Sequence, residues 1–437
     1  MRISVFGCGY LGAVHAACMA KLGHEVVGID VLEEHIAMLE AGRPPFHEPG
    51  LPELLKEALS SGRLHFTTDA SAAADATVHF ICVGTPQKKH ENAADLSYVR
   101  SAVGSLLPSL KPGDVVVGKS TVPVGTAEEL QERVHEAQSG AELIWNPEFL
   151  REGFAVKDTL TPDRFVYGAE PTEQGRAAMA VLDEVYAKAL STGTPKIEAD
   201  LATAQLVKVA ANSFLATKIS FINAMAELCE ATGADVTLLA DSIGHDARIG
   251  RKFLNAGLGF GGGCLPKDIR AFMARAGELG VADALTFLRE VDSVNMRRRV
   301  RMVDLAREVC GGSIVGRTIA VLGAAFKPDS DDIRDSPALS VAAQMQLQGA
   351  HVTVTDPKAI DNAKKKWPDL VFVDGVEDAV AGAEAVLLLT EWPEYLALDP
   401  EELRQHVAAP VIVDGRNALD PVVWRAAGWT YRALGRP

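Results

Sequence analysis

The chain has 437 residues, 48% of them hydrophobic and 23% charged, a composition typical of a soluble globular protein and not of a disordered or fibrous one. Lys and Arg total 43 against 58 Asp and Glu, and this net charge of −15 argues against nucleic-acid or anionic-membrane binding, which needs a basic face. The length corresponds to roughly three domains. No stretch reaches the about 20 uninterrupted apolar residues of a membrane helix, and the N-terminus begins a strand without a secretion signal.

The six cysteines are scattered and contain no CxxC pair. In so long a chain this predicts neither a disulfide framework nor a metal site. We therefore expect a cytoplasmic protein with reduced thiols.

The first 30 residues predict a strand, a tight turn, a helix and a second strand. An apolar run at 2–6 precedes GCGYLG, and the second strand ends at Asp30. In that setting Gly7, Gly9 and Gly12 let the backbone approach a pyrophosphate at the helix N-terminus. Asp30 would accept hydrogen bonds from the adenosine ribose and repel a 2′-phosphate, so the sequence favours NAD over NADP. The alternative is an ordinary turn without a ligand.

Further strands are predicted at 76–84, 114–121 and 142–146, alternating with helical stretches, which indicates a parallel, doubly wound sheet. From 201 to 233 an uninterrupted apolar periodicity predicts one long helix or two abutting ones, ended by Gly233. Helical texture continues to about residue 300, apart from glycines at 257–263.

Alternation of strands and helices returns after the Gly-Gly pair at 311–312. The predicted strands are 317–326, 350–356, 383–391 and 409–415. The fold class is therefore α/β, with two Rossmann-like doubly wound parallel-sheet domains joined by a central helical domain that contains a long helix. The predicted boundaries are 1–200, 201–300 and 301–437.

Cys264 lies in GLGFGGGCLPKD, where glycines leave the backbone open and a proline two residues on can start a helix. A thiol at a helix N-terminus near Lys267 should have a lowered pKa and act as a nucleophile. Asp268, four residues on, would share the thiol's face. The alternative is a structural cysteine, the interpretation we favour for the other five.

Two further pairs of polar residues are candidate site residues, but their spacing alone does not decide between a catalytic and a structural role. Lys208 and Asn212 lie one helical turn apart in the long apolar helix, where a lysine either reaches out to water or belongs to a site. Glu148 and Glu152 flank a loop and are either acid–base groups or a solvated charge pair.

A series of unusual motifs follows in order along almost the whole chain: GCGYLG with Asp30, EPGL (48–51), CVGTP (82–86), KSTVPVGT (119–126), NPEFLREG (146–153), PDR (162–164), LVKVAANSFLATKISFIN (206–223), FGGGCLPKD (260–268), FKPDSDDIRDSP (326–337) and DGRN (414–417). In these motifs the sequence resembles the UDP-glucose/GDP-mannose dehydrogenase family. The resemblance implies two NAD-dependent oxidations of a nucleotide-sugar C6 alcohol to the carboxylate. It also implies that Cys264 retains the aldehyde as a thiohemiacetal and then a thioester. The last domain would bind the nucleotide sugar, and the central domain would form a homodimer or larger homo-oligomer.

The same resemblance assigns roles to residues. Lys208 would stabilise the oxyanion with Asn212 beside it, Asp268 and Glu152 would handle protons, and Thr121 would hold a water. The cofactor-binding matches are Gly7, Gly9, Tyr10, Leu11, Gly12, Asp30, His35, Thr85, Thr121, Glu152, Lys267 and Arg334. The substrate-binding matches are Glu148, Phe149, Leu150, Arg151, Glu152, Lys208, Asn212, Arg248, Phe253, Leu254, Asn255, Ala256, Gly257, Gly261, Lys327 and Arg416, with Arg248 reaching across a subunit contact.

The sequence departs from the family pattern at three places. His35 replaces a common Lys, Gly263 replaces Ser or Tyr, and KKHENAAD (88–95) replaces a short glycine turn. PDR and ARIG (247–250) favour glucose, and the alternatives are dTDP-glucose, GDP-mannose or a UDP-amino sugar. A two-electron hydroxyacid dehydrogenase would need neither Cys264 nor a third domain, and a non-catalytic sensor would commonly have lost the nucleophile.

Overall fold

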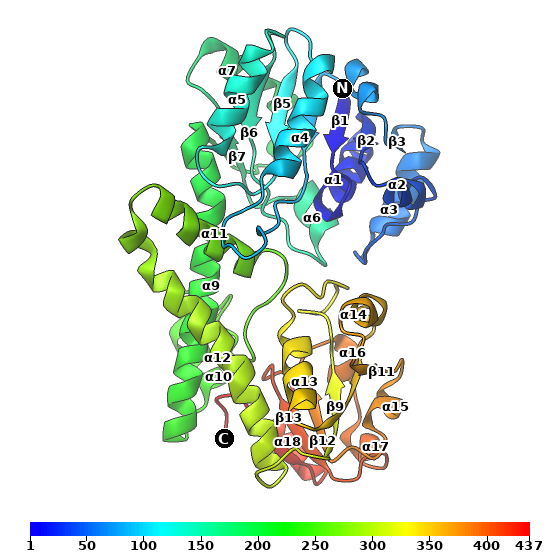
Figure 1. Ribbon diagram of the computed structural model, residues 1–437, viewed down its shortest axis with the longest axis vertical. Coiled ribbons are helices and arrows are strands. Elements are labelled where there is room, and N and C mark those ends of the chain that lie inside the picture. The colour runs from blue at the N-terminus through cyan, green and yellow to red at the C-terminus, as the bar shows by residue number, and fades with distance from the viewer. The chain divides into compact units, whose positions relative to one another are not determined.

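Strands and helices alternate along the computed structural model, which describes residues 1–437 (Figure 1). The strands are β1 (Arg2–Phe6), β2 (Glu25–Ile29), β3 (Leu64–Thr67), β4 (Val78–Ile81), β5 (Val115–Gly118), β6 (Glu142–Trp145), β7 (Phe165–Gly168), β8 (Lys196–Ala199), β9 (Thr318–Leu322), β10 (His351–Thr355), β11 (Val371–Phe372), β12 (Ala385–Leu388), β13 (Val411–Asp414) and β14 (Thr430–Ala433).

The helices of the first half are α1 (Tyr10–Lys21), α2 (Glu33–Glu40), α3 (Leu51–Ser60), α4 (Ser97–Leu106), α5 (Thr126–Glu136), α6 (Ala155–Leu160), α7 (Glu173–Val185), α8 (Ala187–Ser191) and α9 (Leu201–Thr232), with short 3-10 helices η1 (Ala70–Asp75) and η2 (Leu107–Ser109). Those that follow are α10 (Val236–Gly244), α11 (Leu265–Glu278), η3 (Ala282–Leu285), α12 (Thr286–Val309), α13 (Pro337–Leu347), α14 (Ile360–Lys366), α15 (Val376–Val380), α16 (Pro393–Leu396), α17 (Pro400–Leu403) and α18 (Pro421–Ala426). None of them is both long and apolar enough to cross a membrane.

The chain divides into two compact units. The first comprises Met1–Ala211 with Arg270–Gly280, and the second comprises Asn212–Ile269 with Val281–Pro437. Helices α9 and α11 therefore each contribute to both units. The three domains expected from the sequence place their boundaries elsewhere, and those boundaries stay a prediction.

The sheet of the first unit has the strand order β3-β2-β1-β4-β5-β6-β7-β8. Every neighbouring pair is parallel except β6 and β7, which meet antiparallel with Trp145 opposite Gly168. Alternate side chains of β5 enter two different apolar clusters, Val115 and Val117 on one face and Val116 on the other. Because both faces are covered, these strands are continuous apolar runs.

The sheet of the second unit has the order β11-β10-β9-β12-β13-β14 and is parallel throughout. This repeats the order of the first six strands of the first sheet, the doubly wound order in which ligands bind beyond the carboxyl ends of the strands. The predicted fold class is confirmed. Short edge strands such as β3, β8 and β11 were not predicted, because their residues do not form apolar runs.

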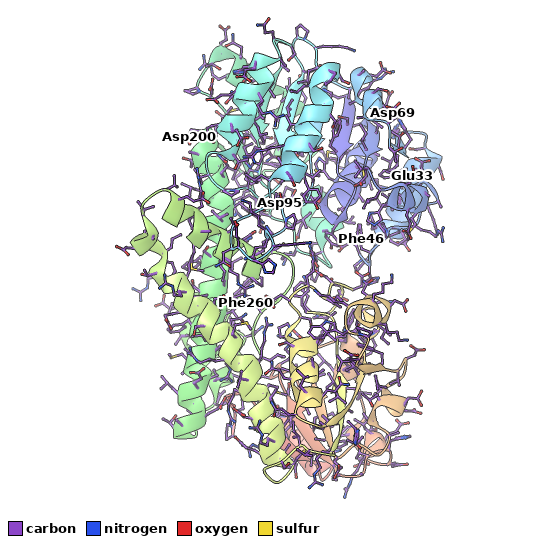
Figure 2. The ribbon with its side chains drawn as sticks, viewed as in Figure 1. Glu33, Phe46, Asp69, Asp95, Asp200 and Phe260 are labelled. Carbon is purple, nitrogen blue, oxygen red and sulfur yellow. The ribbon has the colours of Figure 1, made fainter.

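Helix α9 is the predicted long helix. It begins after Asp200, whose carboxylate accepts the Thr203 N–H at 2.6 Å (Asp200 is labelled in Figure 2), an N-cap contact. It ends at Gly233, whose φ of +75° lies in the left-handed region that favours glycine.

Candidate active site

The turn between β1 and α1 has the geometry of a pyrophosphate-binding turn. A Cβ at Gly12 would collide with the Gly7 carbonyl oxygen, and Gly7 itself has a φ of +87°. Both glycines are therefore required by the fold. Gly9 differs, since a Cβ there would meet nothing within 4 Å. The open space at the N-terminus of α1 suits an anionic group that must approach the backbone closely.

Asp30 follows β2 at the position expected for ribose binding. Its Oδ2 accepts the Cys8 N–H at 2.6 Å and its Oδ1 accepts the Leu32 N–H at 3.0 Å. Each oxygen keeps acceptor capacity for a ribose hydroxyl. Two other predicted cofactor-binding residues lie nearby. Leu11 packs on the apolar cluster behind the turn, and the Nδ1 of His35 is buried without a hydrogen-bond partner.

Two loops at the carboxyl ends of β4 and β5 are joined directly. The Thr85 hydroxyl donates to the Thr121 carbonyl oxygen at 2.7 Å. Thr85 is buried and Thr121 is half-buried. The hydrogen bond holds these two predicted cofactor-contact residues together at the carboxyl edge of the sheet, next to the point between β1 and β4 where the order of the strands reverses.

Beneath these loops lies a buried ion pair that sequence reasoning missed. The Lys119 ammonium is 3.0 Å from Glu148 Oε2, and these side chains are only 4% and 16% exposed. Asn146 Oδ1 and the Tyr186 hydroxyl complete the surroundings of the ammonium at 3.1 and 3.3 Å. Burial works to raise the pKa of Glu148, but the Lys119 charge prevails and holds that pKa below its ordinary value.

The NPEFLREG segment is fixed at both ends by carboxylates. Glu148 Oε1 accepts the N–H groups of Phe149 and Leu150 at 2.7 and 3.0 Å. At the other end Glu48, 1% exposed, accepts the N–H groups of Gly153 and Ala155, each at 2.7 Å. The segment between these anchors is the one predicted to bind substrate.

Other contacts complete this segment. The Tyr10 hydroxyl donates to Glu48, and Phe46, labelled in Figure 2, lies with its ring 4.7 Å from the Tyr10 ring. Arg151 pairs with Asp158 through two nitrogens at 2.7 and 2.8 Å, so its guanidinium is engaged within the chain. Glu152 is half-buried. The sequence left open whether Glu148 and Glu152 are acid–base groups or a solvated charge pair. The structure shows Glu148 largely buried and paired with Lys119.

Lys208 is half-buried on the first turns of α9, and its Nζ lies 5.4 Å from the centre of the Phe149 ring. No acceptor within the chain forms a hydrogen bond or ion pair with this ammonium. Its charge helps to lower the pKa of Glu148, after the larger effects of burial and Lys119. Because α9 is continuous, Asn212 follows one turn later on the same face.

Cys264 is the N-cap residue of α11. Its carbonyl oxygen accepts the Asp268 N–H at 2.9 Å, the first hydrogen bond of the helix. Cys264 is the exposed cysteine of the chain, while four others are buried and Cys310 is partly buried. Burial raises the pKa of Cys82 to about 12 and also raises that of Cys8. Those thiols are unreactive by comparison.

Asp268 is the best-connected group beside the thiol. It is 2% exposed, its Oδ2 accepts the Asn212 amide at 2.6 Å, and its Oδ1 lies 2.6 Å from the Lys267 ammonium. Asn212 and Asp268 are 56 residues apart, and the structure brings these two predicted catalytic residues into contact.

The glycine-rich segment before Cys264 packs against the chain's own backbone. Phe260, labelled in Figure 2, exchanges two hydrogen bonds with the Asn295 amide at 2.7 and 2.9 Å. Asn223 accepts the Gly257 N–H at 2.9 Å, and a Cβ at Gly261 would collide with the Asp335 carbonyl. Neither asparagine was predicted, although each is a fully buried polar residue within a helix.

The remaining predicted substrate residues of the second unit differ in their surroundings. The Arg416 guanidinium donates to the carbonyl oxygens of Leu389, Gly259 and Phe326, and burial lowers its pKa. Arg334 pairs with Asp332 and fills the space that a side chain at 263 would need. The loop before the glycine-rich segment contains Phe253, whose φ is +66°, and the buried residues Leu254 and Ala256. It also contains exposed Asn255, whose Oδ1 accepts a hydrogen bond from Arg251. Arg248 is 88% exposed and pairs with Asp246, and Lys327 lies 5.6 Å from the Phe326 ring.

Comparison with known proteins decides the family. Residues 1–190, 202–297 and 320–421 match the NAD binding, central and UDP binding domain models of the UDP-glucose/GDP-mannose dehydrogenase family. The chain belongs to this family. The resemblance found in the sequence is confirmed, as are its identification as an NAD-dependent dehydrogenase and its nucleotide-sugar substrate class.

Individual members of the family are similar over their full length. The chain is 42% identical over 443 residues to the UDP-glucose 6-dehydrogenase of Rhizobium meliloti (strain 1021), covering 100% of both proteins. It is also 42% identical over 441 residues to UDP-glucose 6-dehydrogenase TuaD of Bacillus subtilis (strain 168), covering 100% of this chain and 93% of that one. The structure of a UDP-glucose dehydrogenase from the hyperthermophilic archaeon Pyrobaculum islandicum superimposes with a TM-score of 0.89 at 39% identity, covering 100% and 98% of the two chains.

Proposed function

We propose that the protein oxidises the C6 alcohol of UDP-glucose to the carboxylate of UDP-glucuronate with two NAD and one water, and that Cys264 retains the intermediate covalently. The observation that carries the proposal is the placement of Cys264. It is the exposed thiol of the chain, caps α11 and lies one turn from buried Asp268. Full-length similarity to UDP-glucose 6-dehydrogenases supports the choice of substrate.

The reaction consists of two oxidations at C6 and one hydrolysis. Loss of a proton from the C6 hydroxyl and of a hydride from C6 gives an aldehyde, and the Cys264 sulfur adds to it to form a thiohemiacetal. Loss of a second proton and hydride gives a thioester. Water then attacks the thioester carbonyl, the C–S bond breaks, and the thiol is restored as the carboxylate leaves.

The chain's own groups fit these steps. The Lys208 ammonium has no acceptor within the chain and is available to the negative charge that develops on the C6 oxygen. Asp268 and Glu152 are our candidates for moving protons, and Thr121 for holding the attacking water. The Asn212 amide fixes the Asp268 carboxylate in place.

Bound NAD supplies the hydride acceptor in both oxidations. The space that Gly9 leaves open would hold its pyrophosphate, and the free acceptor positions of Asp30 would hold its adenosine ribose. Gly7, Gly12, Thr85, Lys267 and Arg334 are proposed contacts on the basis of the family motifs.

The proposal includes an assembly and a location. Three large apolar side chains at seven-residue spacing, Phe214, Phe221 and Leu228, are 66%, 47% and 58% exposed on α9. Burying such a stripe against a second copy supports a homodimer through the central helices. A reactive thiol and a supply of NAD support a cytoplasmic location.

The test is the amount of NADH formed per sugar at limiting substrate, with UDP-glucose, dTDP-glucose and GDP-mannose assayed side by side. We expect two NADH per UDP-glucose and little from the other two. One NADH with release of the aldehyde would refute the thioester mechanism, and two NADH from another sugar nucleotide would refute the substrate. Cys264→Ser should abolish the four-electron turnover.

A further inference from the structure

Two cationic side chains lie against the ring of Phe149. The Arg164 Cζ is 3.9 Å from the ring centre and the Lys208 Nζ is 5.4 Å from it. A guanidinium this near to the centre of a ring lies over its face, because the ring's own atoms would hold an edge-on cation farther away. Arg164 therefore covers one face of Phe149.

The sheet topology explains why these residues meet. Trp145 at the end of β6 pairs with Gly168 of the antiparallel strand β7. Phe149 lies four residues after Trp145 and Arg164 four residues before Gly168, so this one pair brings the two segments that carry them close together. The side-chain amide of Asn146 also joins the two segments by donating to the Val166 carbonyl at 2.9 Å.

Phe149 is held both at its backbone and at its ring. Its backbone N–H is bound by Glu148, which Lys119 holds in place, and Arg164 covers its side chain. Neither Arg164 nor Lys208 forms a hydrogen bond or ion pair within the chain. The contact of each with Phe149 is thus the interaction that restrains its charged end.

We propose that Arg164 is a positioning residue: by stacking on Phe149 it fixes the ring, and the ring in turn directs the Lys208 ammonium towards the C6 oxygen. The proposal rests on the oxyanion role of Lys208 in the proposed function. Arg164 contributes rigidity and also repels the lysine charge, which narrows the positions that the ammonium can occupy. A planar guanidinium can both stack on the ring and repel Lys208, whereas the ammonium of a lysine at position 164 could not stack.

The first test compares Arg164→Met, Arg164→Lys and the control Arg176→Met. Arg176 is an exposed arginine of α7 in the same unit, and its guanidinium donates only to the Pro171 carbonyl at 3.3 Å. We expect kcat for UDP-glucose oxidation to fall about tenfold in Arg164→Met, with the KM values for sugar and NAD within about twofold of wild type, because small displacements of a catalytic group lower the rate strongly. Arg164→Lys should recover little, and the control should behave as wild type.

A second test asks whether Arg164 acts through the lysine. In a Lys208→Met background, Arg164→Met should lower the residual kcat by less than about twofold, since coupled residues are not additive. A tenfold loss that persists in that background, or a raised KM for the sugar nucleotide, would mean that Arg164 binds substrate itself and would overturn the proposal. Unchanged kcat in folded Arg164→Met would also overturn it.

A third readout does not depend on turnover. Lysines are reductively methylated with 13C-formaldehyde and a borohydride reductant, and the Lys208 signal is assigned from its absence in Lys208→Arg. The NMR shift of that signal should change in Arg164→Met and in Phe149→Leu but not in Arg176→Met, and an unmoved signal would refute the positioning role. Wild-type enzyme without activity on UDP-glucose would refute the proposed function alone, because this measurement would still report on Arg164.

Discussion

Removing the Lys119 ammonium should destabilise the first unit severely. The Lys119→Met substitution keeps the volume of the side chain but leaves the Glu148 carboxylate, 16% exposed, without the cation 3.0 Å away. The Asn146 and Tyr186 oxygens lose a donor as well. Breaking a buried pair on one side costs about 3–5 kcal/mol, because the remaining charge is left uncompensated.

The assay is urea unfolding followed by circular dichroism. With a slope of about 2–3 kcal/mol per molar urea, the expected loss moves the midpoint of the first unit down by about 1–2.5 M. The matched control is Lys188→Met, an exposed lysine of α8 in the same unit, which should leave the midpoint unchanged within error. The double variant Lys119→Met/Glu148→Gln removes both charges and should recover most of the loss.

The pH dependence of the stability loss in Lys119→Met is a second test of the buried ion pair. Burial is the largest influence on Glu148 and acts against ionisation, so in Lys119→Met it should raise the pKa of that carboxyl; the loss of stability should then be present above that pKa and fade as the pH falls through it. A Lys119→Met midpoint equal to that of Lys188→Met, or a deficit that grows in acid, would refute the buried-pair interpretation.

Three further outcomes are expected. Gly9→Ala should fold as wild type yet bind NAD at least about tenfold more weakly, as measured by calorimetry. Gly12→Ala should also lower the unfolding midpoint, because its Cβ would collide with the Gly7 carbonyl oxygen, and equal stability of the two variants would contradict this. Burial holds the pKa of His15 well below its ordinary value, so the unfolded chain takes up a proton below about pH 6.5 that the folded chain does not, and stability should fall by up to about 1.4 kcal/mol per pH unit. His15→Leu should flatten that slope, and an unchanged slope would assign it to other groups. Cys264 should react with iodoacetamide before any other thiol in the folded protein, as mapped by mass spectrometry, and earlier labelling of Cys310 would contradict its assignment.

Much of the fold could be predicted because its signals are local. The turn at Gly7, the acid at Asp30 and the apolar helix ended by Gly233 all follow from neighbouring residues, and the structure has them where the sequence placed them. The antiparallel strand β7 was not predicted, since its orientation depends on a partner 23 residues distant. Strand direction is decided by packing, which a local pattern does not contain.

The site could be predicted only in part for the same reason. Cys264 and Asp268 share a helix turn, and their spacing alone indicated their proximity. The buried pairing of Lys119 with Glu148 joins residues 29 apart, and the Asn295 contact with Phe260 joins residues 35 apart. The family resemblance assigned Arg416 to substrate, and the structure adds three backbone carbonyls that occupy its guanidinium.

The second sheet repeats the order of the first six strands of the first sheet, and an acid again follows directly after its second strand in the chain, β10. That acid, Asp356, is 2% exposed and accepts five N–H groups, those of Ala324, Ala325, Lys358, Ala359 and the Trp392 indole. Asp30 accepts two and keeps the rest of its capacity. The five donors occupy the Asp356 carboxylate, so the second sheet has no free carboxylate acceptor for a ribose at this position. High NAD concentrations should therefore not inhibit the enzyme competitively against its sugar substrate at that acid.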